Sequence, residues 1–214
     1  MCCRYLLLRD DLRALLAQLG MPDEEGDVAY FADADRYNIA PCAKISVVRK
    51  RECVSLNWNF AARSAGPLFN ARAESLRDKP AFREAARLRR CLIPASGFYE
   101  WAKAGRARLP WLFQLRDAEP FFMAGIWEGD ACAIITTGPN SLMQPIHNRM
   151  PAIIHASDVG AWLDDEERAR LLLAPFAAER MTARRVSTYV NNARNEGAAC
   201  VGAASEDESG MLLF

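Results

Sequence analysis

The middle of the chain is a series of short apolar runs separated by Gly, Asp and Pro, and this spacing constrains the fold more than any other feature. The runs cover residues 91–94, 111–116, 121–127 and 131–137. Each is long enough for a strand, and the breaks consist of turn-forming residues. Strands spaced this closely pair consecutively and antiparallel, which favours a barrel-like sheet.

Further strands and helices are expected on both sides of these runs. Strands are predicted at residues 43–49 and 53–58, around a charged turn at 50–52, and at 186–189. Helices are predicted at residues 9–19 before Gly20, at 77–90 with Pro80 near the start, at 157–163 and at 166–173. The expected fold is α+β: a single compact domain over residues 1–214, with a mixed, mainly antiparallel β-barrel-like core flanked by helices. Residues 203–214 are expected to form a mobile tail.

Composition narrows the class of protein. Hydrophobic residues make up 51% of the chain, enough for a substantial core. Lys and Arg number 27 and Asp and Glu 27, and this balance argues against a protein that coats nucleic acid over its whole surface. A local groove remains possible, because residues 72–90 hold an excess of basic side chains. Seven cysteines without a CxxC pair, and two histidines, predict neither disulfides nor a metal site, and no cofactor is expected.

Compartment and assembly are also expected from the sequence. We expect no signal peptide at the start and no membrane span, because no apolar run approaches the ~20 residues that a span requires. A cytoplasmic monomer is the default expectation.

Cys2 has a chemistry of its own if Met1 is removed. The mature N-terminal residue then carries a free α-amine, with a reference pKa of about 7.7–8.0, and a free thiol. An aldehyde can condense with the amine to a Schiff base, and the thiol can close on the imine carbon to give a five-membered thiazolidine. The second step is intramolecular, which is a large entropic advantage. Taken alone, Cys2 is better explained as an ordinary small apolar residue at the start of a chain.

Polar residues embedded in apolar segments give Cys2 a context. Asn70 lies in PLFNARAES, Glu100 in RRCLIPASGFYEW and His147 in IHNRMPAII, and the segments FFMAGIWE and IITTGPN lie between the last two. Such polar side chains must find partners or perform chemistry. With MCCRY at the start and RYNIAP at 36–41, the sequence resembles the SRAP family, the SOS-response-associated peptidase-like proteins, from residue 1 to about 201.

The resemblance implies an α+β fold around a barrel-like sheet and covalent crosslinking to abasic sites in single-stranded DNA. It implies that Cys2 is the nucleophile and that Asn70 orients the N-terminal residue. It implies that Glu100 is the active-site carboxylate, and that His147 assists opening of the sugar ring and proton transfer. Histidine suits that role because it titrates near neutrality.

The resemblance also implies a groove for single-stranded DNA. It assigns Arg4, Arg72 and Arg149 to phosphate contacts, which guanidinium groups make bidentately. It assigns Pro41 and Trp58 to the path of the DNA, where a flat apolar surface can stack a base.

The sequence departs from the family at two places, and two other functions compete. Cys3 stands where the family has glycine, and the stretch after Trp58 lacks the aromatic pair with which relatives wedge against a duplex end.

One alternative is a thiol autopeptidase or peptidase, in which Cys2, Asn70, Glu100 and His147 hydrolyse an amide. The other is a noncovalent module that binds single-stranded DNA.

Overall fold

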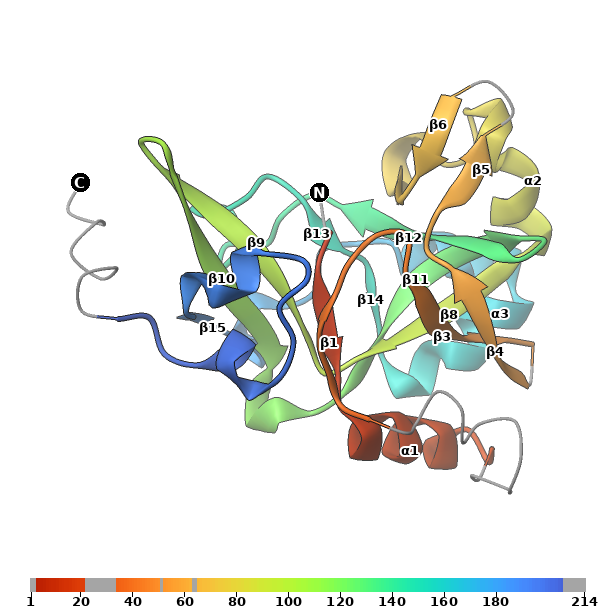
Figure 1. Ribbon diagram of the computed structural model, residues 1–214. Helices are drawn as coiled ribbons and strands as arrows, with labels where there is room; N and C mark the ends of the chain where they lie inside the picture. The colour runs from red at the N-terminus through yellow and green to blue at the C-terminus, as the bar shows by residue number, and fades with distance from the viewer. Residues whose placement is uncertain (1–2, 22–33, 51, 63–64, 206–214) are drawn as a thin grey trace.

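A closed barrel of five strands forms the centre of the computed structural model, which describes residues 3–21, 34–50, 52–62 and 65–205 (Figure 1). Around the barrel the order is β12 (Ala131–Thr137), β4 (Glu52–Asn57), β3 (Lys44–Arg49), β8 (Arg90–Ala95) and β11 (Phe121–Glu128). The ring closes because β11 also pairs with β12. The contact between β12 and β4 is parallel and the others are antiparallel, so the barrel is mixed.

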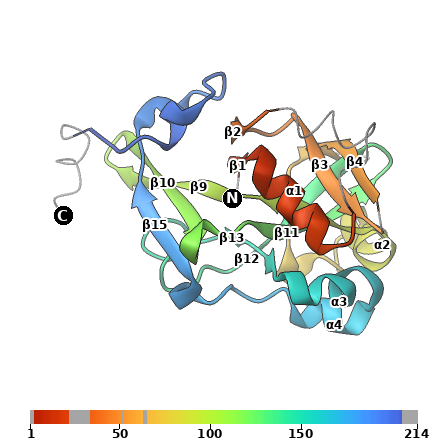
Figure 2. The same cartoon turned by 90° about the horizontal axis from the view of Figure 1, so that it is seen from below.

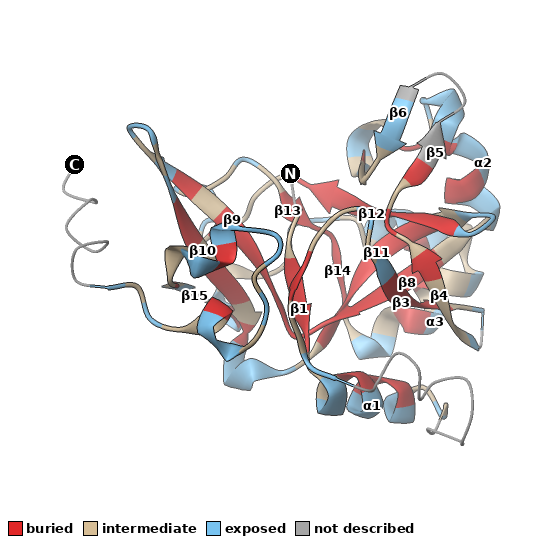
Figure 3. Cartoon of the chain, in the orientation of Figure 1, coloured by how far each residue is buried: buried red, intermediate tan, exposed pale blue. Residues whose placement is uncertain are grey.

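Burial explains why the barrel strands are so apolar. Every residue of β12 is buried, as are all residues of β8 except the first. Strands buried on both faces read as continuous apolar runs rather than as alternating patterns. Figure 3 shows this buried centre in red, with exposed residues on the outer helices and turns.

A second sheet extends from one side of the barrel. Its strands are β15 (Met181–Arg185), β10 (Ala107–Leu115), β9 (Gly97–Ala104), β1 (Tyr5–Leu7) and β2 (Arg36–Ile39), in that order. Gly97 begins β9, where a Cβ atom would lie 2.9 Å from Leu6 Cδ2 and 2.9 Å from the Phe113 carbonyl oxygen. Glycine therefore lets β1 and β10 approach β9 from both sides.

Four helices cover the sheets. They are α1 (Arg9–Gln18), α2 (Pro80–Leu88), α3 (Val159–Asp164) and α4 (Glu166–Leu171). The inner faces are apolar: α1 buries Leu12, Leu15 and Leu16. Seen from below, α1 lies in front near the middle of the molecule, while α3 and α4 lie together at one corner (Figure 2). None of the helices among the described residues has the length and apolar character needed to cross a membrane.

Short elements complete the chain. The strands are β5 (Phe60–Ala62), β6 (Ala65–Leu68), β7 (Asn70–Arg72), β13 (Met150–Pro151) and β14 (Ile153–Ile154). Short 3-10 helices lie at Ala73–Ser75, Arg116–Ala118, Ala156–Asp158, Ala178–Arg180, Thr188–Asn191 and Ala198–Val201. Strand β7 runs parallel to β12, with Asn70 opposite Ile134 and Arg72 opposite Thr136.

The expected α+β class with a barrel-like core is confirmed, and most predicted elements lie within a few residues of their positions. The strand predicted at 186–189 is wrong. The last strand is β15, and Thr188–Asn191 is a 3-10 helix whose flanking Val186 and buried Val190 pack in a small apolar cluster. Strand β9 was not predicted, because a carboxylate interrupts its apolar pattern. Most of the predicted tail, 206–214, lies outside the described residues.

Candidate active site

Glu100 lies in the middle of β9, on the face turned toward the barrel-side core. Its neighbours on that face of the strand are the buried Phe98 and Ala102, and only 2% of the residue is exposed. Burial opposes the charged form and raises the pKa of Glu100 to about 7. A carboxyl group in this range can both give and take a proton at neutral pH.

His147 approaches Glu100 from the other side of the site. It lies in the turns between β12 and β13, and its Nδ1 is 3.8 Å from Glu100 Oε1. This distance is too long for a hydrogen bond, but a small group beside the two side chains is within reach of both. Burial lowers the pKa of His147, so the imidazole is largely neutral at pH 7.

The backbone of Arg149 holds the imidazole in place. The Arg149 N–H lies 3.1 Å from His147 Nδ1 and can donate to it, and the Arg149 carbonyl oxygen lies 3.1 Å from the same nitrogen and can accept from it. Nδ1 accepts when it is bare and donates when it carries a proton. The ring therefore has a partner in either state, which suits a group that moves protons.

The turns that carry His147 are themselves anchored. The Asn140 side chain accepts from the Met143 N–H at 2.9 Å and donates to the Phe176 carbonyl at 2.8 Å. The His147 N–H then donates to the Met143 carbonyl at 3.0 Å. These bonds fix the imidazole relative to the barrel although no long strand contains it.

The N-terminal strand leads to Glu100. Tyr5 pairs with Phe98 of β9, and the Tyr99 N–H donates to the Arg4 carbonyl at 3.0 Å. The pKa of the Cys3 thiol is raised by burial and then by the negative charge of Glu100, which indicates that residue 3 and this carboxylate are close. Cys2, the predicted nucleophile, lies outside the described residues.

Asn70 and Arg72 belong to the short strand β7. The parallel pairing with β12 places them along the strand whose following turns carry His147. Asn70 is half-buried and Arg72 is exposed. Among the described residues, no hydrogen bond or ion pair engages the Arg72 side chain, so its guanidinium is open to a ligand.

Arg4 is held in the interior by neutral groups. Its Nη1 donates to Asn38 Oδ1 at 2.7 Å and to the Val190 carbonyl at 3.0 Å, and its guanidinium lies 5.6 Å from the centre of the Trp101 ring. Asn38 is 4% exposed and donates in turn to the Asn192 and Asn195 carbonyls. This network ties the C-terminal loop to the start of the chain.

Arg149 is held by a carboxylate instead. Its two terminal nitrogens donate to Glu74 Oε1 at 2.8 Å and Oε2 at 2.9 Å, and Nη2 also reaches the Thr136 carbonyl at 2.5 Å. The hydrogen bonds from Arg149 lower the pKa of Glu74. The guanidinium predicted to bind phosphate is thus already paired within the chain.

The two residues predicted to stack bases differ in exposure. Pro41 is half-buried in the turn before β3 and keeps an open surface. Trp58 is 0% exposed, donates its indole N–H to the Phe69 carbonyl at 2.8 Å, and packs edge-on against Tyr5. We therefore assign Trp58 to the core and not to a DNA surface.

Three residues contribute to the site region without having been predicted from the sequence: Asn38, Glu74 and Thr136. Asn38 lies within RYNIAP and Glu74 within PLFNARAES, but their partners are distant in sequence. The described parts of the chain contain no group of three or more His, Cys, Asp or Glu side chains that could hold a metal ion.

Known proteins resemble this chain in both sequence and fold. The family model described as "SOS response associated peptidase (SRAP)" matches residues 1–193. The Bacillus subtilis protein named abasic site processing protein YoqW is 34% identical over 183 residues, covering 74% of this chain and 82% of its own. The Escherichia coli abasic site processing protein YedK is 29% identical, covering 94% and 99%. A crystal structure of a Bacteroides thetaiotaomicron protein superposes with a TM-score of 0.80 at 24% identity, covering 95% and 100%, and supports the fold.

Proposed function

Because the chain belongs to the SOS response associated peptidase family, we propose that it senses and shields abasic sites in single-stranded DNA by bonding covalently to the exposed aldehyde. The observation that carries the proposal is the Glu100–His147 pair, a buried carboxyl group and an imidazole 3.8 Å apart, near the residues that precede the start of β1. Relatives named abasic site processing proteins support the choice of DNA lesion.

The proposed reaction begins with the sugar. An abasic sugar is mostly a closed hemiacetal, so a proton must leave its hydroxyl while another reaches the ring oxygen. We assign this transfer to His147, whose Nδ1 is supported in both protonation states by the backbone of Arg149. The open form then presents an aldehyde.

Two bonds form in the following steps. The α-amine of Cys2, once Met1 has been removed, attacks the aldehyde carbon, and water leaves to give a Schiff base. Glu100 supplies the proton for the departing water and takes one from the amine. The Cys2 thiol then adds across the C=N bond: sulfur joins the carbon, the proton goes to nitrogen, and a thiazolidine closes.

The DNA strand in this proposal contacts the arginines around the site. Arg72 is open to a phosphate, and Arg149 lies beside His147, whereas Arg4 is held by Asn38, Val190 and Trp101 on the other face of β9. Pro41 offers an apolar surface to a base. Contacts of this kind hold the backbone of a strand without reading its sequence.

The test uses single-stranded DNA with one abasic site, a denaturing gel and intact mass. The wild type, with Met1 removed, is expected to give a stable adduct. Cys2→Ala is expected to lose it, retaining at most a Schiff base that reduction can trap. Cys3→Ala is the matched control: its nitrogen is acylated and cannot close the ring, so its adduct should persist.

The result that would overturn the proposal is an adduct of wild-type yield in Cys2→Ala. Turnover of peptides without any adduct would indicate instead the peptidase activity that the family description names.

A further inference from the structure

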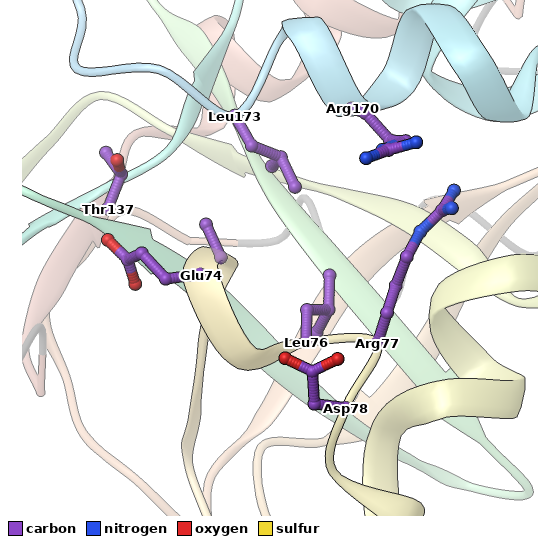
Figure 4. Close-up of a pocket in the computed structure, with 8 residues that line it drawn as sticks. Glu74, Leu76, Arg77, Asp78, Thr137, Arg170 and Leu173 are labelled. Atoms are coloured by element: carbon purple, nitrogen blue, oxygen red, sulfur yellow. The ribbon is translucent and has the colours of Figure 1, made fainter.

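A cavity of about 480 Å³ adjoins the candidate active site (Figure 4). It lies between the Ala73–Ser75 turn, the end of β12 and helix α4, and Glu74 and Thr137 line its near end. Glu74 binds Arg149, and Arg149 supports His147, so two contacts separate the imidazole from the cavity. The cavity is therefore placed to receive the part of a DNA strand next to the lesion.

The walls of the cavity combine apolar and polar surfaces. Leu76 and Leu173 face the space from opposite elements, and Figure 4 shows the guanidinium groups of Arg77 and Arg170 approaching one another at the far end, with the Asp78 carboxylate near Leu76. The cavity therefore has an apolar strip between the two leucines and polar groups at both ends, so it offers a flat ligand an apolar contact and hydrogen-bonding partners at its edges.

The charges of the cavity are compensated. Arg77 Nη2 lies 2.8 Å from Glu166 Oε1, and Arg170 Nη1 lies 3.6 Å from Glu167 Oε2. Asp78 adds a further carboxylate. This arrangement offers donors and acceptors without a strong net charge, so it suits a neutral ligand better than a phosphate.

We propose that this cavity receives the base of a nucleotide that flanks the abasic site, an inference that rests on the function proposed above. An unstacked base has an apolar face for the two leucines and a polar edge for the arginines and Asp78. Guanine is the preferred occupant, because its O6 and N7 are the acceptors that arginine recognises. The phosphate between this base and the lesion would then pass Arg149.

The experiment measures the affinity of the full-length protein for short single strands that carry a tetrahydrofuran abasic analogue, which has no aldehyde and cannot crosslink. Each neighbour of the analogue in turn is A, C, G, T or a second tetrahydrofuran. Removing the base on one side is expected to weaken binding about fivefold or more, as for a base lost from a stacking site. On the other side the loss should be smaller, and guanine should bind best in the cavity.

Arg170→Gln tests the residues directly. Its side chain is 57% exposed, so the change should not disturb folding, and the dependence on the flanking base should disappear. Arg168→Gln is the matched control: it is on the same helix, 76% exposed and paired at 3.6 Å with Asp165, but it does not line this cavity. It should keep the dependence.

The two proposals fail in different ways. If the wild type neither binds nor crosslinks abasic strands, the proposed function is wrong. If it crosslinks them but the flanking base has no effect on affinity, or Arg170→Gln behaves as Arg168→Gln does, the cavity does not hold a base.

Discussion

The two halves of the candidate site are built differently. On the side of the second sheet, Arg4 precedes β1 and Glu100 lies within β9, so backbone ladders fix both. On the barrel side, His147 and Arg149 lie in the irregular segment before β13, where hydrogen bonds outside any strand ladder fix them. The difference teaches that the position and the pKa of the Glu100 carboxyl group are set by the sheet and by burial. The position of the His147 imidazole is set by a few local contacts.

The largest expected effect separates the two halves by their chemistry. His147→Ala should slow crosslinking to an abasic sugar far more than reaction with a small aldehyde that has no ring to open. Glu100→Ala should slow both reactions, since every Schiff base needs its proton transfers. Loss of one acid–base group typically costs about 10²–10⁴-fold in rate. Intact mass against time measures each variant with each substrate.

A particular result would break this division of roles. If His147→Ala slows the two substrates equally, the imidazole does not open the sugar, and positioning of the DNA or of Cys2 is its better assignment. A spontaneously open fraction of the sugar reduces the size of the His147 effect but does not reverse its selectivity.

The second effect concerns the cost of burying Glu100. Its pKa is raised from 4.5 to about 7, so the folded state holds a proton that the unfolded state releases between these values. The unfolding free energy therefore falls as pH rises through this window, and stays lowered above it. Glu100→Gln removes this cost and should stabilise the fold at pH 8 by on the order of 2–3 kcal/mol.

Urea unfolding at pH 8 and near pH 4.5 measures the difference. The gain should vanish at the lower pH, where the wild-type carboxyl is protonated in the fold as well. Glu119→Gln, at an exposed position, is the control for the amide substitution and should change little at either pH. If Glu100→Gln raises the unfolding free energy equally at both pH values, the stabilisation comes from packing and not from the removal of a buried charge.

The sequence predicted the barrel half of the molecule well, because its signals are local. The run 131–137 is apolar at its first five positions and is a strand buried throughout, and Gly20 follows the first helix in a left-handed conformation with φ of 68°. Such features follow from neighbouring residues. Strand β9 escaped prediction because its central carboxylate can be buried only where other elements surround it.

The polar contacts of the site could not be predicted for the same reason. Glu74 and Arg149 are 75 residues apart in the chain, and Arg4 and Val190 are 186 apart. The family resemblance supplied Glu100 and His147 as candidates, but the fold alone brings them within 3.8 Å. Trp58 was placed on the DNA path by resemblance, and only the burial of its ring assigns it to the core.

The third effect compares two arginines that are held by different partners. Arg4→Ala removes the donor to Asn38 Oδ1 and leaves the Val190 carbonyl with only the Asn38 Nδ2 donor at 3.4 Å, which should cost about 1–2 kcal/mol of unfolding free energy. Arg149→Ala should cost less. Its partner Glu74 is 57% exposed, so water can replace the guanidinium there, and the loss from the interior is limited to the hydrogen bonds to Thr136. Urea unfolding of the two variants measures the contrast, and a larger loss for Arg149→Ala would reverse it.

The smallest expected effect concerns Glu74, which occupies the face of Arg149 that a phosphate would use. The hydrogen bonds from Arg149 lower the pKa of Glu74, so it is an anion at neutral pH and competes with the strand. Glu74→Gln should therefore raise the affinity for undamaged single strands severalfold at low salt. It should also steepen the dependence of log affinity on log salt by about 0.7, the contribution of one phosphate contact.

Glu52→Gln is the matched control, since Glu52 is 55% exposed and pairs at 2.9 Å with Arg49, away from the site. If Arg149 contacts the strand, its guanidinium should gain a phosphate contact once the Glu74 carboxylate is removed, and the salt dependence of the affinity should steepen. An unchanged salt dependence in Glu74→Gln would mean that Arg149 does not contact the strand and serves only to hold His147.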